Sequence, residues 1–308
     1  MSAVDSVLLI AFGGPEKPEE IRPFLRIVAA GRRIPPERLE EVAHHYELIG
    51  GRSPLNELTR RQAEGLRRVL KREGIFAPVY VGMRNWHPFF HETLAEMAAR
   101  GHRRALGIIL SAFQTEASWG RYMGDVAAAR EKVGPDAPEV GYAPAWFDHP
   151  RFIETMADRA TDALSRVSPD RRSLTPLVFT AHSVPSAMAE GSPYVAQFEV
   201  ASRMVAARLE HPRWSVAYQS RSGSPSDAWL EPDVADALRR LAAEGATDAV
   251  VVPIGFVCDH VEVLYDLDVE ARAVARQLGL RFHRATTAND HPAFVEMLAD
   301  LARAGLKG

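Results

Sequence analysis

The sequence predicts an α/β protein made of two similar Rossmann-like domains, each an open parallel sheet covered by helices, with a cleft between them. Short apolar runs, typical of buried strands, alternate along the chain with longer amphipathic segments typical of helices. The alternation starts again after residues 143–145 (APA), so both halves have the same rhythm. At 308 residues the chain is long enough for two domains. We therefore predict one domain at residues 1–145 and a second at residues 146–308.

The first half begins with an apolar strand that ends at Gly13-Gly14-Pro15, where the glycines allow a tight turn but do not form a GxGxxG motif. Asn56 is expected to cap the long amphipathic helix that follows it. The predicted strands of this half are 7–12, 78–83, 105–111 and 138–142, and the predicted helices are 16–25, 37–48, 56–72, 88–100 and 115–133.

The second half repeats the pattern, and two of its strands are followed by segments rich in polar residues. The predicted strands are 174–181, 214–219, 249–254 and 280–283, and the predicted helices are 149–167, 193–209, 232–243, 259–278 and 292–304.

Composition and charge exclude several classes of function. The chain is 46% apolar and 25% charged, as in ordinary soluble globules, and its net charge of −3 gives no general attraction for nucleic acid. A membrane span needs about 20 consecutive apolar residues, and the sequence has no such stretch. We also expect no signal sequence. The single cysteine, Cys258, excludes an internal disulfide and a cysteine-bound iron–sulfur cluster within one chain. We expect a cytoplasmic monomer that requires neither a membrane nor a nucleotide cofactor.

Two segments carry the candidate chemistry, and both follow apolar strands. Glu262, Asp266 and Glu270 are four residues apart, which places three carboxylates on one face of a helix. His182 follows the strand at 174–181. Side chains at the carboxyl ends of parallel strands face the crevice where such sheets bind ligands, so His182 and Glu262 are expected to bind a divalent cation or to accept protons. Taken singly, each residue also fits a structural histidine or a solvated acidic helix.

With both segments in view, the sequence resembles the ferrochelatase family. TAHSVP at 180–185 resembles the SAHS-L-P segment that carries the histidine of the family, and residues 253–266 resemble the PVGF–DH-E-LYD segment that carries its glutamate. Further similarity, in the order of the family, lies in FGGP at 12–15, YELIGGRSPL at 46–55, GMR at 82–84, YQS at 218–220 and WL at 229–230.

The resemblance implies a chelatase-type fold with a porphyrin in the cleft between the halves, His182 and Glu262 at the iron, and Asp266 and Glu270 as further metal ligands along the helix. It also implies that porphyrin contacts come from Phe12, His45, Tyr46, Ser53 and Tyr122. Some members have arginines where this chain has Ala29 and Ala30, so the propionates are expected to pair with Arg26, Arg32 or Arg33 instead.

The implied activity is insertion of Fe²⁺, the substrate metal, into a porphyrin during haem biosynthesis. The sequence leaves open whether the ring is coproporphyrin III or protoporphyrin IX, and which of His182 and Glu262 is the first ligand or the proton acceptor. Two alternatives also fit the residues: a porphyrin or haem carrier without chemistry, and a cobalt or nickel chelatase acting on a tetrapyrrole.

Overall fold

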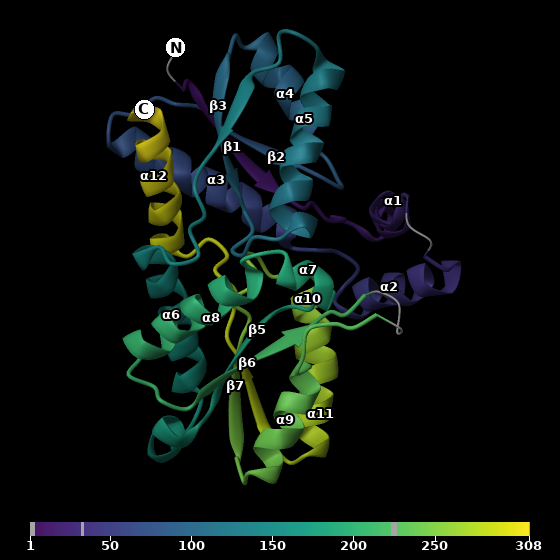
Figure 1. Cartoon of the computed structure of the whole chain (residues 1–308), viewed down its shortest axis with the longest axis vertical. Coiled ribbons are helices and arrows are strands. Elements are labelled where there is room, and N and C mark those ends of the chain that lie inside the picture. The colour runs from purple at the N-terminus through teal and green to yellow at the C-terminus, as the bar shows by residue number, and fades with distance from the viewer. Residues whose placement is uncertain (1–3, 32–33, 223–226, 308) are drawn as a thin grey trace. The chain divides into compact units, whose positions relative to one another are not determined.

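The computed structural model describes residues 4–31, 34–222 and 227–307, in two compact units (Figure 1). One unit comprises Met1–Ser111, Ala117–Ala145 and Asp290–Gly308, and the other comprises Ala112–Glu116 and Trp146–Asn289. Each unit has its own parallel four-stranded sheet, so the predicted α/β class is confirmed. The first compact unit also includes the last helix of the chain. The predicted division into domains 1–145 and 146–308 stays a prediction.

The sheet of the first unit has the strand order β2-β1-β3-β4, with all neighbours parallel. Every residue of β1 is buried, because β1 lies between two strands and is covered on both faces, which explains its continuous apolar run. The strands are β1 (Ser6–Ala11), β2 (Val79–Met83), β3 (Arg104–Ile109) and β4 (Glu139–Tyr142). The helices are α1 (Pro18–Ala29), α2 (Pro36–Leu48), α3 (Leu55–Arg72), α4 (Phe90–Ala99), α5 (Arg121–Val133) with a π-helical turn at Glu116–Gly120 before it, and α12 (Pro292–Lys307).

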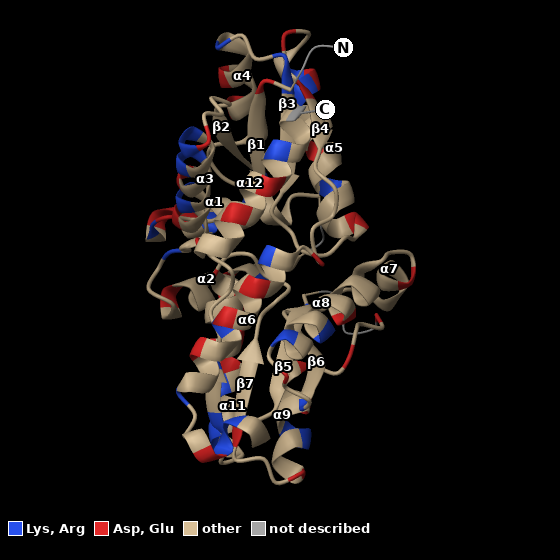
Figure 2. Cartoon of the chain, turned by 90° about the vertical axis from the view of Figure 1, so that its left-hand side faces the viewer, with Lys and Arg blue, Asp and Glu red and all other residues tan. Residues whose placement is uncertain are grey.

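Helix α3 shows how the pattern of the sequence becomes packing. Its apolar stripe, which includes Ala63, Leu66 and Leu70, is buried, while its Lys and Arg residues form the blue bands visible in Figure 2. Helix α12 packs on α3 so closely that a Cβ added at Gly65 would lie 2.9 Å from a methyl group of Val295. The glycine therefore permits this helix contact.

The second unit has the strand order β6-β5-β7-β8, again all parallel, which is the topology of the first unit. The strands are β5 (Leu177–His182), β6 (Trp214–Gln219), β7 (Asp248–Val252) and β8 (Arg281–Arg284). The helices are α6 (Pro150–Ser165), α7 (Ser186–Glu190), α8 (Tyr194–Arg208), α9 (Val234–Ala243), α10 (Val261–Leu264) and α11 (Arg272–Gln277), with a 3₁₀ turn η2 (Pro169–Leu174) and a π-helical turn η3 (Asp266–Ala271).

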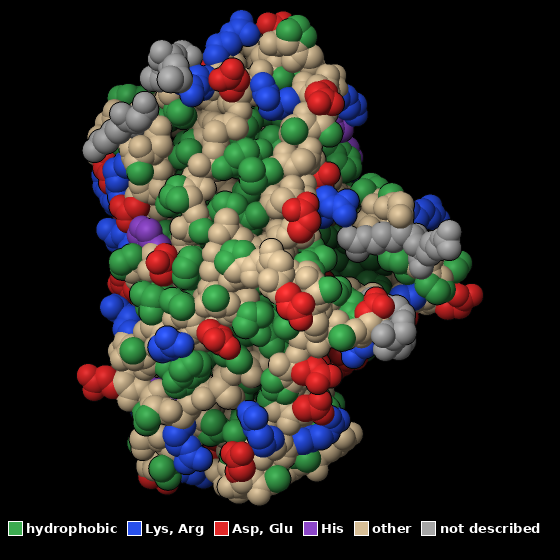
Figure 3. Space-filling view, in the orientation of Figure 1, with side chains coloured by type: hydrophobic (Ala, Val, Ile, Leu, Met, Phe, Trp, Pro, Cys, Tyr) green, Lys and Arg blue, Asp and Glu red, His purple; other side chains and the backbone are tan. Residues whose placement is uncertain are grey.

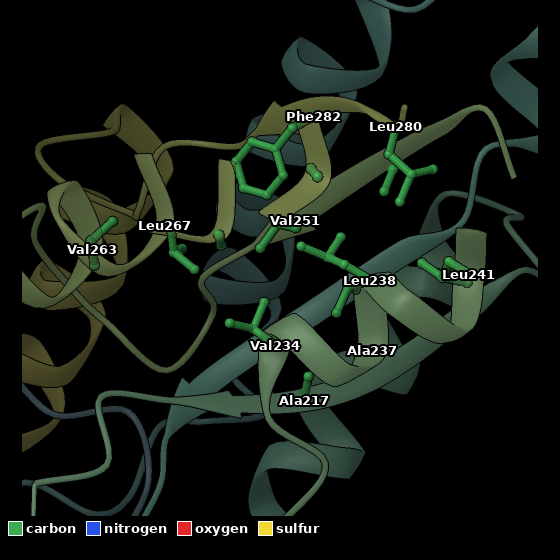
Figure 4. Packing of buried hydrophobic residues seen from close by; sticks show 14 of the residues in the cluster. Ala217, Val234, Ala237, Leu238, Leu241, Val251, Val263, Leu267, Leu280 and Phe282 are labelled. Carbon is green, nitrogen blue, oxygen red and sulfur yellow. The ribbon is translucent and has the colours of Figure 1, made fainter. Parts of the chain in front are cut away.

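An apolar cluster fixes the segment that carries the predicted acidic row. Val263 and Leu267 are fully buried and pack with residues of α9, β7 and β8, among them Leu238, Val251 and Phe282 (Figure 4). Since these two residues lie one position after Glu262 and Asp266 respectively, burying the apolar face of the segment orients the acidic side chains away from the cluster.

At the opposite end of the same sheet, a buried carboxylate connects three elements. The Asp248 side chain, at the start of β7, accepts hydrogen bonds from Arg281 on β8 at 2.8 and 2.7 Å. His283 lies 3.1 Å and Arg171 of η2 lies 3.3 Å from the same carboxylate. The bonds from Arg281 are the main reason why the pKa of Asp248 lies well below its ordinary value, against the opposing effect of burial.

Two local predictions were wrong. The helix expected at 259–278 is divided into α10, the π-helical turn η3 and α11. At the start of η3 the Tyr265 carbonyl accepts hydrogen bonds from the N–H groups of both Val269 and Glu270, at 3.0 and 3.1 Å. Asn56 does not cap α3. Its amide instead exchanges two hydrogen bonds with the backbone of Gly14, at 2.8 and 2.9 Å, and so anchors the turn after β1.

Among the described residues, the surface shown in Figure 3 has no large region of one charge, in agreement with the small net charge of −3. Acidic, basic and apolar side chains are interspersed on the face shown in Figure 3. Within the described ranges, no helix is both long enough and apolar enough to span a bilayer.

Candidate functional site

The candidate site lies in the second unit, where the strand order changes direction. From β5 the chain continues to β6 on one side, and β7 lies on the other side of β5. His182 is the last residue of β5, and Glu262 lies on α10, which follows β7. Ligands of open α/β sheets bind at such switch points, beyond the carboxyl ends of the strands. Here the structure brings the two side chains together, with 3.6 Å between His182 Nε2 and Glu262 Oε1.

The backbone fixes the orientation of the His182 ring. Its Nδ1 lies 2.5 Å from the Ser183 carbonyl oxygen. Because a carbonyl can only accept, Nδ1 carries the hydrogen, and in the neutral ring Nε2 presents its lone pair towards Glu262. The Tyr194 hydroxyl of α8 donates to the carbonyl of His182 at 2.8 Å and holds the end of the strand.

Glu262 is held from two further directions. His260 Nε2 lies 3.4 Å from its second carboxylate oxygen, so the carboxylate lies between two imidazoles. Gln219, which pairs in register with His182 at the ends of β6 and β5, donates to the Glu262 carbonyl at 2.6 Å. The Nδ1 of His260 is buried and has no hydrogen-bond partner among the described residues.

The electrostatics of the pair favour opposite charges. Burial alone would raise the pKa of Glu262, but His182 and His260 outweigh it and hold that pKa well below the usual range. For His182, burial acts to lower the pKa, and the Glu262 carboxylate outweighs burial and raises it. The site therefore favours an ionised carboxylate beside an imidazole that readily accepts a proton.

The acidic row continues from this pair along the π-turn. Burial, with the charges of Glu262 and Glu270, raises the pKa of Asp266 to about 7, although a hydrogen bond from the Ser220 hydroxyl opposes the rise. Ser220 follows β6 and has a φ of +63°, a conformation that is uncommon for residues other than glycine. Glu262 lies on α10, whereas Asp266 and Glu270 lie on the π-helical turn η3. The expected row of carboxylates is thus carried by two types of helix rather than by one regular α-helix.

The pair has the dimensions of a metal site with two protein ligands. His182 Nε2 and Glu262 Oε1, which lie 3.6 Å apart, would be the two ligands of a shared divalent ion. Among the residues that the structure describes, no group of three or more His, Cys, Asp or Glu side chains is placed to hold a metal ion. The fold and the site define an α/β protein with a histidine–carboxylate pair suited to binding a divalent ion or accepting protons.

Aromatic side chains gather in the first unit around Phe24, a residue that the sequence did not single out. Its ring lies edge-on to Phe12, Tyr46 and Trp86, with centroids 6.4, 6.1 and 6.1 Å away. Trp86 Nε1 donates to Glu20 of α1 at 3.0 Å, which holds the indole beside this cluster. Phe12 directly follows β1, so it lies at the corresponding switch point of the first sheet.

The other predicted porphyrin contacts differ in how deeply they are buried. Ser53 is 4% exposed, and its hydroxyl accepts the Leu55 N–H at 3.3 Å. Tyr122 is buried on α5. His45 is half-buried on α2, where burial and the charge of Arg38 lower its pKa. Arg26 is exposed at the end of α1, whereas Arg32 and Arg33 lie outside the described residues.

Comparison with known proteins identifies the family. The sequence pattern of the Ferrochelatase family matches residues 4–306. The chain is 46% identical over 314 residues to a coproporphyrin III ferrochelatase of Nocardia farcinica, covering 99% of this chain and 89% of that one. It is 43% identical over 302 residues to a ferrochelatase of Rhodopirellula baltica, covering 97% and 85%. The sirohydrochlorin chelatase SirB of Bacillus subtilis, solved with cobalt, has the same fold at a TM-score of 0.60, 10% identity and coverage of 99% and 96%.

The chain therefore belongs to the ferrochelatase family. It is an enzyme that inserts iron into a porphyrin in haem biosynthesis, and neither a non-catalytic carrier nor a chelatase for cobalt or nickel is favoured.

Sequence reasoning missed several residues of the site for identifiable reasons. Gln219 lies in the YQS similarity at 218–220 but was given no role, and Tyr194 was not singled out. Both act through backbone carbonyls, and the role of such contacts leaves no pattern in a single sequence. His260 had a signal, since it stands two residues before Glu262, but that spacing alone also matches unrelated motifs. Ser220 follows directly from the end of β6, where polar residues are candidates for any ligand crevice.

Proposed function

We propose that the protein inserts Fe²⁺ into coproporphyrin III, and that His182 and Glu262 carry out the metal and proton chemistry. The observation that supports this most directly is the 3.6 Å separation of His182 Nε2 and Glu262 Oε1, with the Nδ1 of the imidazole bound to a carbonyl. The choice of ring is supported by relatives at 46% identity that are named coproporphyrin III ferrochelatases.

The reaction sets clear requirements. Fe²⁺ and a free-base porphyrin give the iron porphyrin and two protons, so the site must bind a hydrated ion and accept protons from two pyrrole nitrogens. A bound imidazole and a carboxylate match the ligand preferences of a divalent first-row ion. Either side chain can also serve as a general base. We propose that one of the two binds the ion while the other accepts a proton, and that Asp266 and Glu270 bind the ion on its way to the pair.

For the ring, we propose contacts with Phe12, Tyr46, His45, Ser53 and Tyr122. The edge-on contacts of Phe12 and Tyr46 with Phe24 support packing against a flat macrocycle, because aromatic faces combine a large apolar area with few rotatable bonds. We further propose that the enzyme works as a cytoplasmic monomer.

The test is an anaerobic assay with purified protein, Fe²⁺ and either coproporphyrin III or protoporphyrin IX, followed by the loss of free-porphyrin absorbance. We expect turnover of coproporphyrin III, and turnover of protoporphyrin IX alone would contradict the choice of ring. Binding of both rings without turnover would support a carrier instead.

Two variants test the residues. His182→Ala should fold and abolish insertion, and Glu262→Gln should raise the KM for the metal if the carboxylate is the ligand. His211→Gln is a matched control, because His211 is a buried histidine of the same unit that bonds the Thr175 carbonyl at 2.7 Å. Near-normal turnover by His182→Ala would contradict the assignment.

A further inference from the structure

Arg284 bonds both ends of the segment 259–268, which contains Glu262 and Asp266 of the acidic row. It is the last residue of β8, and its side chain is only 10% exposed. Its Nη1 donates to Asp259 at 3.0 Å, and its Nε donates to Asp268 at 2.9 Å. Asp259 stands three residues before Glu262, and Asp268 stands two residues after Asp266. One guanidinium therefore spans residues 259–268, which contain two of the candidate metal ligands, Glu262 and Asp266.

Each of the two anchoring carboxylates also has a second partner. Asn289 donates to the other oxygen of Asp259 at 2.9 Å and accepts the Asp259 backbone N–H at 3.0 Å. The other oxygen of Asp268 is 2.8 Å from Arg272. Each carboxylate that Arg284 bonds is therefore also bonded by a second side chain.

We propose that Arg284 is a positioning residue that sets the affinity of the site for its substrate metal by fixing the geometry of residues 259–268. The inference rests on the proposed function, because it takes Glu262 and Asp266 as metal ligands. Within the part of the chain that the structure describes, the Arg284 side chain bonds Asp259, Asp268 and the Ala285 carbonyl but neither Glu262 nor His182, so it acts through the backbone between its two carboxylate partners.

The chemistry of the contact requires arginine. A planar guanidinium offers several N–H donors in fixed directions and can bond two carboxylates at once, whereas the ammonium of a lysine is a single point of charge. In this segment the backbone changes from α-helical to π-helical, with the Tyr265 carbonyl accepting from two N–H groups. Residues that orient metal ligands from outside the coordination sphere have large effects on metal binding.

The strand itself provides a matched control. Arg281 lies on β8 as well, but it bonds Asp248 at the opposite end of the sheet. If Arg284 only stabilised the fold, Arg284→Met would, like Arg281→Met, lower the melting temperature and leave the KM for the metal unchanged. The proposal predicts that they differ in metal binding.

The experiment compares Arg284→Met, Arg284→Lys and Arg281→Met with the unaltered full chain. The assay measures the KM for Zn²⁺ and the KM for porphyrin separately, together with the melting temperature and the visible absorption of bound Co²⁺. Changes outside the coordination sphere commonly weaken metal binding by about 10- to 100-fold, so we expect both Arg284 variants to raise the KM for Zn²⁺ by about tenfold or more and to alter the Co²⁺ spectrum. The KM for porphyrin should stay within about twofold.

Arg281→Met should lower the melting temperature and leave both KM values unchanged. The proposal is overturned if Arg284→Lys, the variant that keeps the charge and is most apt to fold, retains the metal KM of the unaltered chain, or if Arg281→Met raises that KM equally. These outcomes are distinct from failure of the proposed function, which would appear as insertion by His182→Ala.

Discussion

Replacing Asp248 by Asn should destabilise the protein and change how its stability depends on pH. The Asp248 side chain is 1% exposed and contacts Arg281, His283 and Arg171. Removing one partner of a buried ion pair costs about 3–5 kcal/mol. The Arg281 side chain is 51% exposed, so its guanidinium can be hydrated when its partner is lost, and we expect the lower end, about 3 kcal/mol at pH 7.

The pH dependence follows from the direction of the pKa shift. The pKa of Asp248 is lower in the folded protein than its ordinary value of 3.8. The carboxylate therefore contributes stability that is fully present above that ordinary value and is lost as the pH falls through the folded pKa. The difference between Asp248→Asn and the unaltered chain should be constant from about pH 5 to 7 and should narrow below about pH 4.

Urea unfolding followed by circular dichroism at pH 7, 5 and 3.5 measures both effects. Asp236→Asn is the control, since Asp236 forms an exposed pair with Arg239 on α9, and such pairs contribute little. The reasoning is refuted if Asp248→Asn lies within about 1 kcal/mol of the unaltered chain at pH 7, or if the difference does not change with pH.

Three other changes have expected outcomes. Leu267→Ala should lower the free energy of unfolding by about 2–5 kcal/mol, because Leu267 is fully buried in the cluster of Figure 4. Thermal unfolding measures the loss, with Val269→Ala as the control at a position that is 38% exposed. Equal losses in the two variants would contradict the prediction. Gly65→Ala should lower the free energy of unfolding by about 1–3 kcal/mol, because the added methyl group overpacks α3 against α12. The double variant with Val295→Ala should recover part of this stability. A single variant as stable as the unaltered chain would refute the close contact. Tyr194→Phe removes the donor to the His182 carbonyl and should cost about 1 kcal/mol, measured by urea unfolding, and no change in stability would show that the bond contributes nothing.

Most of the fold was predictable because its signals are local. The apolar run of β1 lies within a few residues, and burial on both faces of a central parallel strand requires such a run. The same holds for β5 and β7, whose positions led to the candidate pair at their carboxyl ends. The resemblance to a family then came from motifs that extend along nearly the whole chain.

What the sequence did not reveal depends on contacts between distant residues or on subtle backbone geometry. Arg284 bonds carboxylates 25 and 16 positions earlier, and no local pattern connects these residues. The π-turn at Asp266–Ala271 differs from an α-helix by one residue in its hydrogen bonding, and its apolar spacing still reads as helical. Asn56 has the composition of a helix cap, yet its amide bonds Gly14, which is 42 residues away.

The packing of α12 on α3 has a consequence for how the chain is made. The first compact unit contains residues before and after the second one, so its helix α12 is synthesised only after the whole of residues 146–289. Until then the surface of α3 around Gly65, which Val295 covers in the finished protein, remains exposed. Domains generally fold as units during synthesis, and exposed apolar surface promotes aggregation. Nascent chains halted before α12 should therefore depend on chaperones to protect their amino-terminal half, while the contiguous stretch of the second unit has already emerged.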